Sequence, residues 1–373
     1  MYHYIKYYTI PLIAALVIVG ILLGEHWMWL GFSILCIVVV GGDAVLGEDP
    51  SIPEYSYSRL LEVPLHLALP TVLLLLAILA WASGSDTQDS LGLGNLLSGV
   101  FTYNLVAARN ASGWTDYIGA VISTGFIVGG YGTVAAHELT HRVKNRIAML
   151  EGKWLLSISC NTDFSIEHVY GHHVTVGTDA DPATAKKGEN VYVFFIRSTV
   201  DGHISAWKLE LKRLRKKSYS IFSFRNRMIT GYLMSLLWIG LFYLVGGIFG
   251  LVLFLSQAVV AKFLLEVVNY IEHYGLTRPP GTPVRPEHSW NTNKRMSAMV
   301  LFSLTRHSAH HEKPKVQFWK LDPCIHAPQM PYGYLTTLLI CLIPQSGIAS
   351  LLPIWISGKS NMLRDKLKYN SLS

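Results

Sequence analysis

Six long apolar segments limit what this chain can fold into more than any other feature of its sequence. A helix needs about 20 mostly apolar residues to cross the hydrocarbon layer of a membrane. A sixth segment, 248–270, is apolar as far as Ala261 and then carries Lys262 and Glu266, so its last turns should leave the lipid or face the protein interior. The sequence therefore predicts an all-α integral membrane protein with six transmembrane helices. The five uninterrupted segments are 7–24, 27–46, 61–82, 117–136 and 228–246.

The composition agrees with a membrane protein. Of the 373 residues, 51% are hydrophobic and only 15% are charged, whereas about 25% of the residues in an ordinary soluble domain are charged. No small-residue cleavage site follows the first apolar segment, so we expect that segment to be a retained span and not a signal peptide.

Lysine and arginine are concentrated in two stretches of the chain. Fifteen of the 31 lie between Arg142 and Arg227, and twelve more lie between Arg278 and Lys368. With six spans, both stretches fall on the same side as Lys6, which the positive-inside rule makes the cytoplasmic side. Topology thus explains the net charge of +7 better than nucleic-acid binding does. The basic run at 212–217 suits either anionic lipid head groups or an acidic partner protein.

These patterns divide the chain into four predicted regions. A short segment at 91–108 contains two Gly among its first four residues and two Asn, and we expect it to be interfacial or re-entrant. The apolar segment 333–357 is interrupted by Pro344 and Pro353, so we expect it to lie along the membrane or on the protein. The regions are 1–136 with spans one to four, 137–227 as a cytoplasmic region, 228–270 with spans five and six, and 271–373 as a second cytoplasmic region.

Nine of the 15 histidines fall into four short clusters on the predicted cytoplasmic side. His137 and His141 in HELTH are four residues apart, a spacing that places both rings on one helix face, as two ligands of one metal require. The same spacing separates two histidines of EHVYGHH, and the third histidine there should point to a different side. The seven further cluster members are His168, His172 and His173 in EHVYGHH, His273 in NYIEHYG, and His307, His310 and His311 in RHSAHH.

The number of candidate ligands favours two metal ions. Imidazole binds Zn, Cu, Fe and Ni, so histidine alone does not identify the metal. One catalytic zinc takes three protein ligands, and nine candidates are too many for it. Two alternatives remain open: a membrane zinc metalloprotease built on HELTH, with Glu138 as general base, and a non-catalytic metal permease or sensor.

The four cysteines are scattered and form no C-x-x-C pair, and the chain has no P-loop and no convincing dinucleotide fingerprint. If the chain carries out redox chemistry, its electrons must therefore come from a separate protein.

The histidine segments HELTHR, EHVYGHH, NYIEHYGL and LTRHSAHH resemble those of the membrane-bound alkane 1-monooxygenase family. That family is related to xylene monooxygenase hydroxylase components and to membrane fatty acid desaturases, and NYIEHYG is the motif that desaturases lack. The resemblance implies a cytoplasmic helical cap with a di-iron site, two non-haem Fe ions held by all nine histidines, and a location in the bacterial inner membrane. It also implies hydroxylation of the terminal C–H bond of an alkane with O2, and a rubredoxin-type electron donor with its NAD(P)H-dependent reductase.

Two further expectations concern residues around the site. Carboxylates that hold the second ring nitrogen of metal-bound histidines are expected nearby, and Asp181 in DADPAT suits either that role or an Asp-Pro turn. The stretches YYTIPL and APQMPYGY also resemble the xylene-type enzymes, so a xylene or terpene hydroxylase and a lipid desaturase stay open as alternatives. The candidate carboxylates are Glu138, Glu167, Asp181 and Glu272.

Overall fold

The computed structural model describes residues 2–84, 89, 92–101 and 103–343. In this part of the chain the structure is helical, with two isolated bridges, Glu48 to Lys294 and Asn291 to Gln329, and no strand. The predicted all-helical class is therefore confirmed. The chain forms two compact units: unit 1 comprises residues 1–38, 56–165 and 210–265, and unit 2 comprises 39–55, 166–209 and 266–373.

Five helical stretches within the described residues are long and apolar enough to cross a membrane. The first four agree with the four N-terminal segments that the sequence predicts, although each begins a few residues earlier. The fifth contains both of the remaining predicted segments. The five stretches are His3–Leu23, Glu25–Leu46, Arg59–Ala82, Trp114–Thr140 and Arg227–His273.

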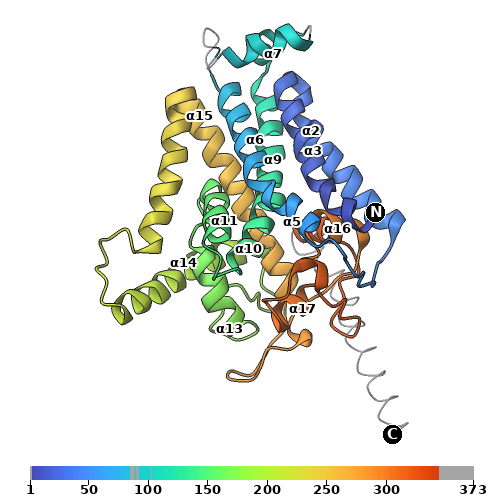
Figure 1. Ribbon diagram of the computed structural model, residues 1–373, viewed down its shortest axis with the longest axis vertical. Coiled ribbons are helices and arrows are strands. Elements are labelled where there is room, and N and C mark those ends of the chain that lie inside the picture. Colours follow the sequence, from blue (N-terminus) through green and yellow to red (C-terminus); the bar gives the residue numbers. More distant parts are fainter. Residues whose placement is uncertain (1, 85–88, 90–91, 102, 344–373) are drawn as a thin grey trace. The chain divides into compact units, whose positions relative to one another are not determined.

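The helices of unit 1 form the bundle to which most of these stretches belong (Figure 1). α2 packs against both α3 and α6, and α3 packs against α9. On α6 the buried side chains include Val72, Leu75, Leu76 and Leu79, whose spacing of three and four residues makes one helix face. The helices of this bundle are α2 (Thr9–Leu23), α3 (Leu30–Cys36), α5 (Arg59–His66), α6 (Ala68–Ala82), α9 (Trp114–Ile127), α10 (Thr133–Thr140) and α11 (Arg146–Ile158).

The longest helix, α15 (Arg227–His273), reverses direction at Gly247. Gly247 has φ 58° and ψ −144°, a backbone conformation that glycine adopts without steric cost. The Phe242 and Phe254 rings on either side of it lie 5.0 Å apart, so the two arms form a hairpin (Figure 1). A straight helix of this length would reach about 70 Å, more than twice the hydrocarbon thickness. The break explains why the sequence predicts two segments here.

Small residues let α9 approach the second arm of α15 closely. A Cβ atom on Gly125 would lie 2.5 Å from Cγ1 of Val260, and one on Gly129 would lie 3.1 Å from the Ala261 carbonyl oxygen. Such spacing of small residues is typical of helix contacts in membranes, where close backbone approach replaces the hydrophobic effect.

Two short helices occupy the predicted interfacial segment and its continuation. α7 (Leu93–Phe101) and α8 (Leu105–Ala111) have nine and seven residues, too few to span a bilayer. The Asn104 side chain caps α8 by accepting a hydrogen bond of 2.9 Å from the Ala107 amide.

Unit 2 consists of short helices, apart from the first part of α14, and it carries most of the clustered histidines. Ser297 donates its backbone amide to Asp43 at 2.9 Å and accepts from the Tyr334 amide at 3.0 Å, so three distant segments meet at one buried serine. Of the predicted apolar segment 333–357, only the part up to residue 343 lies within the described residues. The helices are α4 (Gly42–Leu46), α13 (His173–Thr175), α16 (Arg295–Val300), α17 (His307–Glu312) and α18 (Tyr334–Cys341); α14 (Val191–Lys216) and α15 continue from one unit into the other.

Candidate metal centre

A π-helical turn, η6 (His168–His172), separates the histidines of EHVYGHH. Hydrogen bonds in such a turn run from residue i to i+5, so residues five apart come together in place of residues four apart. The Nε2 atoms of His168 and His173 lie 3.1 Å apart, whereas His172 faces a different set of rings. The expected pairing of His168 with His172 is therefore wrong, because the π-turn shifts the helix face by one residue.

Helix α17 distributes its three histidines in the same way. His307 and His311 are four residues apart, and their ring centroids lie 4.4 Å apart. His310 belongs to a different group, since its Nε2 atom lies 3.1 Å from Nε2 of His173. Both segments thus send rings to two neighbouring clusters within unit 2.

We call the first cluster the four-histidine group: His172, His273, His307 and His311. Its ligand nitrogens lie within 4.8 Å of one another, and all four residues are buried. The Nε2 atoms of His172 and His311 are 3.2 Å apart, as are those of His307 and His273.

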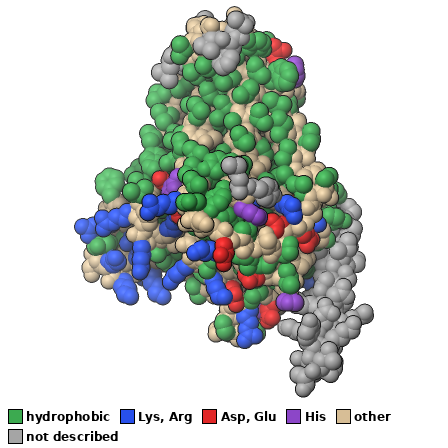
Figure 2. All heavy atoms as spheres, turned by 45° about the vertical axis from the view of Figure 1, so that its right-hand side comes forward, with side chains coloured by type: hydrophobic (Ala, Val, Ile, Leu, Met, Phe, Trp, Pro, Cys, Tyr) green, Lys and Arg blue, Asp and Glu red, His purple; other side chains and the backbone are tan. Residues whose placement is uncertain are grey.

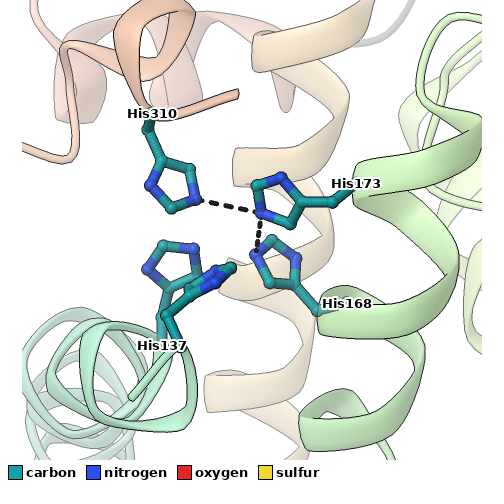
Figure 3. A group of neighbouring side chains, drawn as sticks. His137, His168, His173 and His310 are labelled. Carbon is teal, nitrogen blue, oxygen red and sulfur yellow. Dashed lines mark hydrogen bonds between the residues drawn. The ribbon is translucent and has the colours of Figure 1, made fainter. Parts of the chain in front are cut away.

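We call the second cluster the three-histidine group: His168, His173 and His310. Figure 3 shows these rings turned toward one another, with His173 between the other two. The rings of His173 and His311 have centroids only 4.5 Å apart, so the two groups are adjacent.

The remaining predicted ligands, His137 and His141, lie in unit 1 at the end of α10. Their ring centroids are 4.8 Å apart, as the four-residue spacing predicts. The Phe164 ring covers His137 at a centroid distance of 6.2 Å.

Two of the four candidate carboxylates contact histidines of the four-histidine group. Asp181 places Oδ2 3.0 Å from Nδ1 of His172, and Glu272 places Oε1 3.1 Å from Nδ1 of His307. Asp181 also accepts a hydrogen bond from Thr184 Oγ1 within its turn. It is therefore both a partner of a histidine and a turn residue, the two roles that the sequence leaves open. In each case the carboxylate lies beside the ring nitrogen that points away from the cluster, and at His172 a hydrogen bond joins the two groups, so Nε2 faces inward.

The other two carboxylates have different surroundings. Glu138 forms an ion pair of 3.3 Å with Arg142, which also contacts Glu62 at 3.2 Å. Glu167 is buried and accepts a hydrogen bond of 3.4 Å from Ser205.

Within the four-histidine group, burial and neighbouring charges shift pKa values in different directions: burial works against a charged His172, but the adjacent Asp181 carboxylate raises its pKa above the usual value. Burial alone would raise the pKa of Asp181, but His172 and the Thr184 hydroxyl hold it below its usual range. Burial, followed by the neighbouring imidazoles, lowers the pKa of His311 well below its usual range. A neutral imidazole keeps the lone pair that a metal requires.

Sequence patterns did not single out three residues that support the centre. The Tyr334 hydroxyl donates to Glu272 at 2.8 Å, and Arg278 donates to the carbonyls of Val174 and Val176 at 2.7 and 2.8 Å. Tyr334 lies in the APQMPYGY stretch, and the resemblance of that stretch to xylene-type enzymes is its only signal in the sequence. Nothing in the sequence connects Tyr334 to Glu272. Thr184 lies in DADPAT, where the sequence pointed only to Asp181, and Arg278 carries no such signal.

The chemistry of the donors fits bound metal. Two imidazole nitrogens on one ion, each about 2.1 Å from it, lie about 3.0–3.4 Å apart for angles of about 90–110°. The observed Nε2 separations of 3.1 and 3.2 Å fall in that range. Hydrogen bonding explains the geometry less well, because Nε2 of His173 meets two other ring nitrogens and has one proton or one lone pair to offer.

Comparison with known proteins agrees with this geometry. Residues 112–338 match the fatty acid desaturase family. Alkane 1-monooxygenase 1 of Pseudomonas aeruginosa is 37% identical over 84% of this chain and 77% of its own length. Alkane 1-monooxygenase 2 of the same organism is 33% identical over 88% of this chain and 82% of its own length. The xylene/toluene monooxygenase hydroxylase component of Pseudomonas putida is 27% identical over 95% of this chain and 87% of its own length. The predicted family is thereby confirmed: the chain belongs to the alkane 1-monooxygenase family, within the wider fatty acid desaturase family.

Proposed function

We propose that this protein is a membrane di-iron monooxygenase that converts an alkane to a primary alcohol by hydroxylating its terminal C–H bond with O2. The observation that carries the proposal is the pair of adjacent imidazole groups in unit 2. The η6–α13 segment and α17 each contribute histidines to both the four-histidine group and the three-histidine group. One redox-inactive ion would need only one such group.

The proposed ligand set contains all nine clustered histidines. The four-histidine group would hold one iron, and the three-histidine group together with His137 and His141 would hold the other. Supporting this assignment, the HELTH pair has the helical spacing of two ligands to one metal, and relatives with 31–37% identity are named monooxygenases. Iron suits that activity, whereas zinc has no redox chemistry.

The residues around the histidines would orient the ligands and exclude water. Asp181 and Glu272 lie beside Nδ1 of His172 and His307 and would orient those rings, and Tyr334 would hold the Glu272 carboxyl group in position. When bound, the irons would supply the activation of O2. The four-histidine group and the three residues around it thus form one set of seven, and the sequence predicted every member except Tyr334 as a ligand or candidate carboxylate. The set consists of His172, His273, His307, His311, Asp181, Glu272 and Tyr334.

The proposed topology has six spans, counting the two arms of α15 separately. The predicted regions 137–227 and 271–373 would then be cytoplasmic, in a protein of the bacterial inner membrane, and the clustered histidines would lie on that side. The support is the concentration of Lys and Arg in these regions.

Two electrons for each turnover would come from a rubredoxin-type protein and its NAD(P)H-dependent reductase. All four cysteines, of which Cys160 is exposed, are free. Their separation in the sequence gives the chain no cluster-binding motif of its own.

The second candidate function is hydroxylation of a xylene-type methyl group, which the similarity to the xylene/toluene enzyme favours. Cells that express the protein should be supplied separately with octane, hexadecane and xylene, and the alcohols measured. Primary alcohols from the alkanes support the proposal, and alcohol from xylene alone would replace it with the second candidate. A fatty-acid double bond formed without any alcohol would indicate a lipid desaturase.

The HELTH motif also allows a zinc metalloprotease, in which Glu138 would act as general base. Arg142 holds the Glu138 carboxylate in an ion pair of 3.3 Å, and this contact occupies the group that a general base would need. Metal analysis of the purified protein separates the two functions, because the protease requires zinc.

A further inference from the structure

The connection between α14 and α15 exposes two large aromatic side chains. α14 ends at Lys216 and α15 begins at Arg227. Between them Phe222 is 90% exposed and Phe224 is 83% exposed. Aromatic rings that are this exposed to water do not gain the transfer free energy that burial would provide. This surface therefore requires an apolar environment.

The same connection is strongly basic. Seven Lys and Arg and no Asp or Glu lie between Leu211 and Arg227. The basic side chains that are exposed in the structure are Lys212, Arg215, Lys216, Lys217 and Arg225. Figure 2 shows Lys and Arg gathered on one part of the surface beside exposed hydrophobic side chains.

Buried polar contacts hold this connection in a defined shape. Glu210, which is fully buried, accepts hydrogen bonds from Arg213 at 2.6 Å and from the Arg227 amide at 2.7 Å, so it joins the end of α14 to the start of α15. Asn226 donates to the Ile221 carbonyl at 3.0 Å and accepts from the Met228 amide at 2.9 Å. The aromatic rings are therefore presented by an ordered segment.

The position of the connection identifies its partner. Arg227 is the first residue of a stretch long and apolar enough to span a membrane, so residues 217–226 must lie at the membrane boundary. Aromatic rings flanked by lysine and arginine match the boundary between acyl chains and anionic head groups. An acidic protein would match the charges but would leave Phe222 and Phe224 without an apolar partner.

We propose that the segment from Lys212 to Arg225, which we call the basic aromatic loop, binds anionic phospholipid, with Phe222 and Phe224 inserted among the upper acyl chains and the lysine and arginine side chains on the head groups. Each basic residue near an anionic surface contributes about a fivefold preference for anionic lipid. This inference depends on the chain being in a membrane and not on the proposed reaction.

Lipid insertion is tested by a nitroxide spin label on the full-length protein in lipid nanodiscs. Phe222→Cys is labelled in a background in which Cys36, Cys160 and Cys324 are replaced by Ser, and collisions with O2 and with a water-soluble nickel complex are measured. Lys315→Cys, at an exposed site outside the loop, is the control. We expect the label at position 222 to collide preferentially with O2 and the control label to collide with the nickel complex. Equal nickel accessibility at both positions would overturn the proposal.

Head-group preference is tested by charge reversal. The double variant Lys216→Glu with Lys217→Glu should lose at least about tenfold in its retention of phosphatidylglycerol over phosphatidylcholine, measured by mass spectrometry of the lipids that remain bound. The matched control, Lys313→Glu with Lys315→Glu, reverses two exposed lysines elsewhere and should retain the wild-type preference. An unchanged preference in the loop variant, together with weaker binding of the protein electron donor, would assign the surface to that donor and overturn the lipid proposal.

Discussion

Glu272 directly precedes His273 in the chain, yet its carboxylate lies 3.1 Å from Nδ1 of His307 on a different helix. One short segment at the end of α15 therefore supplies a candidate ligand and the group that orients a second ligand. This arrangement couples the two motifs NYIEHYG and RHSAHH, and it makes Glu272 more important to the centre than its position beside a histidine suggests.

Replacing Glu272 with Gln should weaken metal binding. The change keeps the shape of the side chain but replaces the carboxyl group beside His307 with an amide, and loss of such a partner lowers metal affinity about 10- to 100-fold. Iron retained after dialysis against a chelator provides the measurement. Glu287→Gln, at an exposed carboxylate, should retain wild-type iron. Equal iron in both variants would show that Glu272 does not orient a ligand.

Replacing Tyr334 with Phe should have a smaller effect in the same direction. The variant leaves the buried Glu272 carboxylate without its 2.8 Å hydrogen bond, which costs about 1–3 kcal/mol of stability. We expect a lower thermal unfolding midpoint and faster iron release than in wild type. The control is Tyr332→Phe, which removes the hydroxyl of a half-exposed tyrosine two residues before Tyr334 and should change neither quantity. If the two variants behave alike, the role of Tyr334 is contradicted.

Replacing His273 with Ala should reduce the iron content or abolish turnover. His273 is fully buried in the four-histidine group, and its removal takes away one of four ligands. His26→Ala, at a ring outside both groups, should do neither. A His273→Ala protein with full iron and full activity would remove this residue from the site.

Glu210 should make stability depend on pH in the acid range. Burial alone would raise its pKa, but hydrogen bonds from Arg213 and Arg227 lower it from 4.5 to about 2. Because the folded pKa lies below the unfolded pKa, the carboxylate stabilises the folded state above pH 4.5, and this contribution, on the order of 3 kcal/mol, is lost as the pH falls toward 2. Thermal unfolding of wild type and Glu210→Gln in detergent should differ at pH 7 and converge at low pH. A constant difference across that range would exclude the effect.

Much of the fold follows from the sequence because the bilayer imposes a fixed length on each span. Four helical stretches that are long and apolar enough to cross a membrane lie within a few residues of the predicted bounds, and the fifth stretch is broken at Gly247, where glycine permits the required backbone conformation. The amphipathic α14 and the exposed Phe222 and Phe224 were not predicted, because exposure depends on the tertiary contacts of each side chain.

The composition of the centre was easier to predict than its arrangement. Seven of the nine predicted ligands meet in the two groups of unit 2, and the sequence pointed to them because imidazole pairs at helical spacing are unusual in a chain with so few charged residues. The grouping of His168 with His173 was not predicted, because it depends on one π-helical turn that the residue types do not specify. Tyr334 was not connected to the centre, because its contact with Glu272 joins residues far apart in the chain.

Metal quantification combined with Mössbauer spectroscopy of the purified, iron-57-enriched protein tests the central claim most directly. If both imidazole groups hold iron, the protein should contain two irons per chain, each with the high-spin signature of nitrogen-rich non-haem coordination. Zinc in place of iron, or a single iron per chain, would contradict the proposal that the two groups form a di-iron centre.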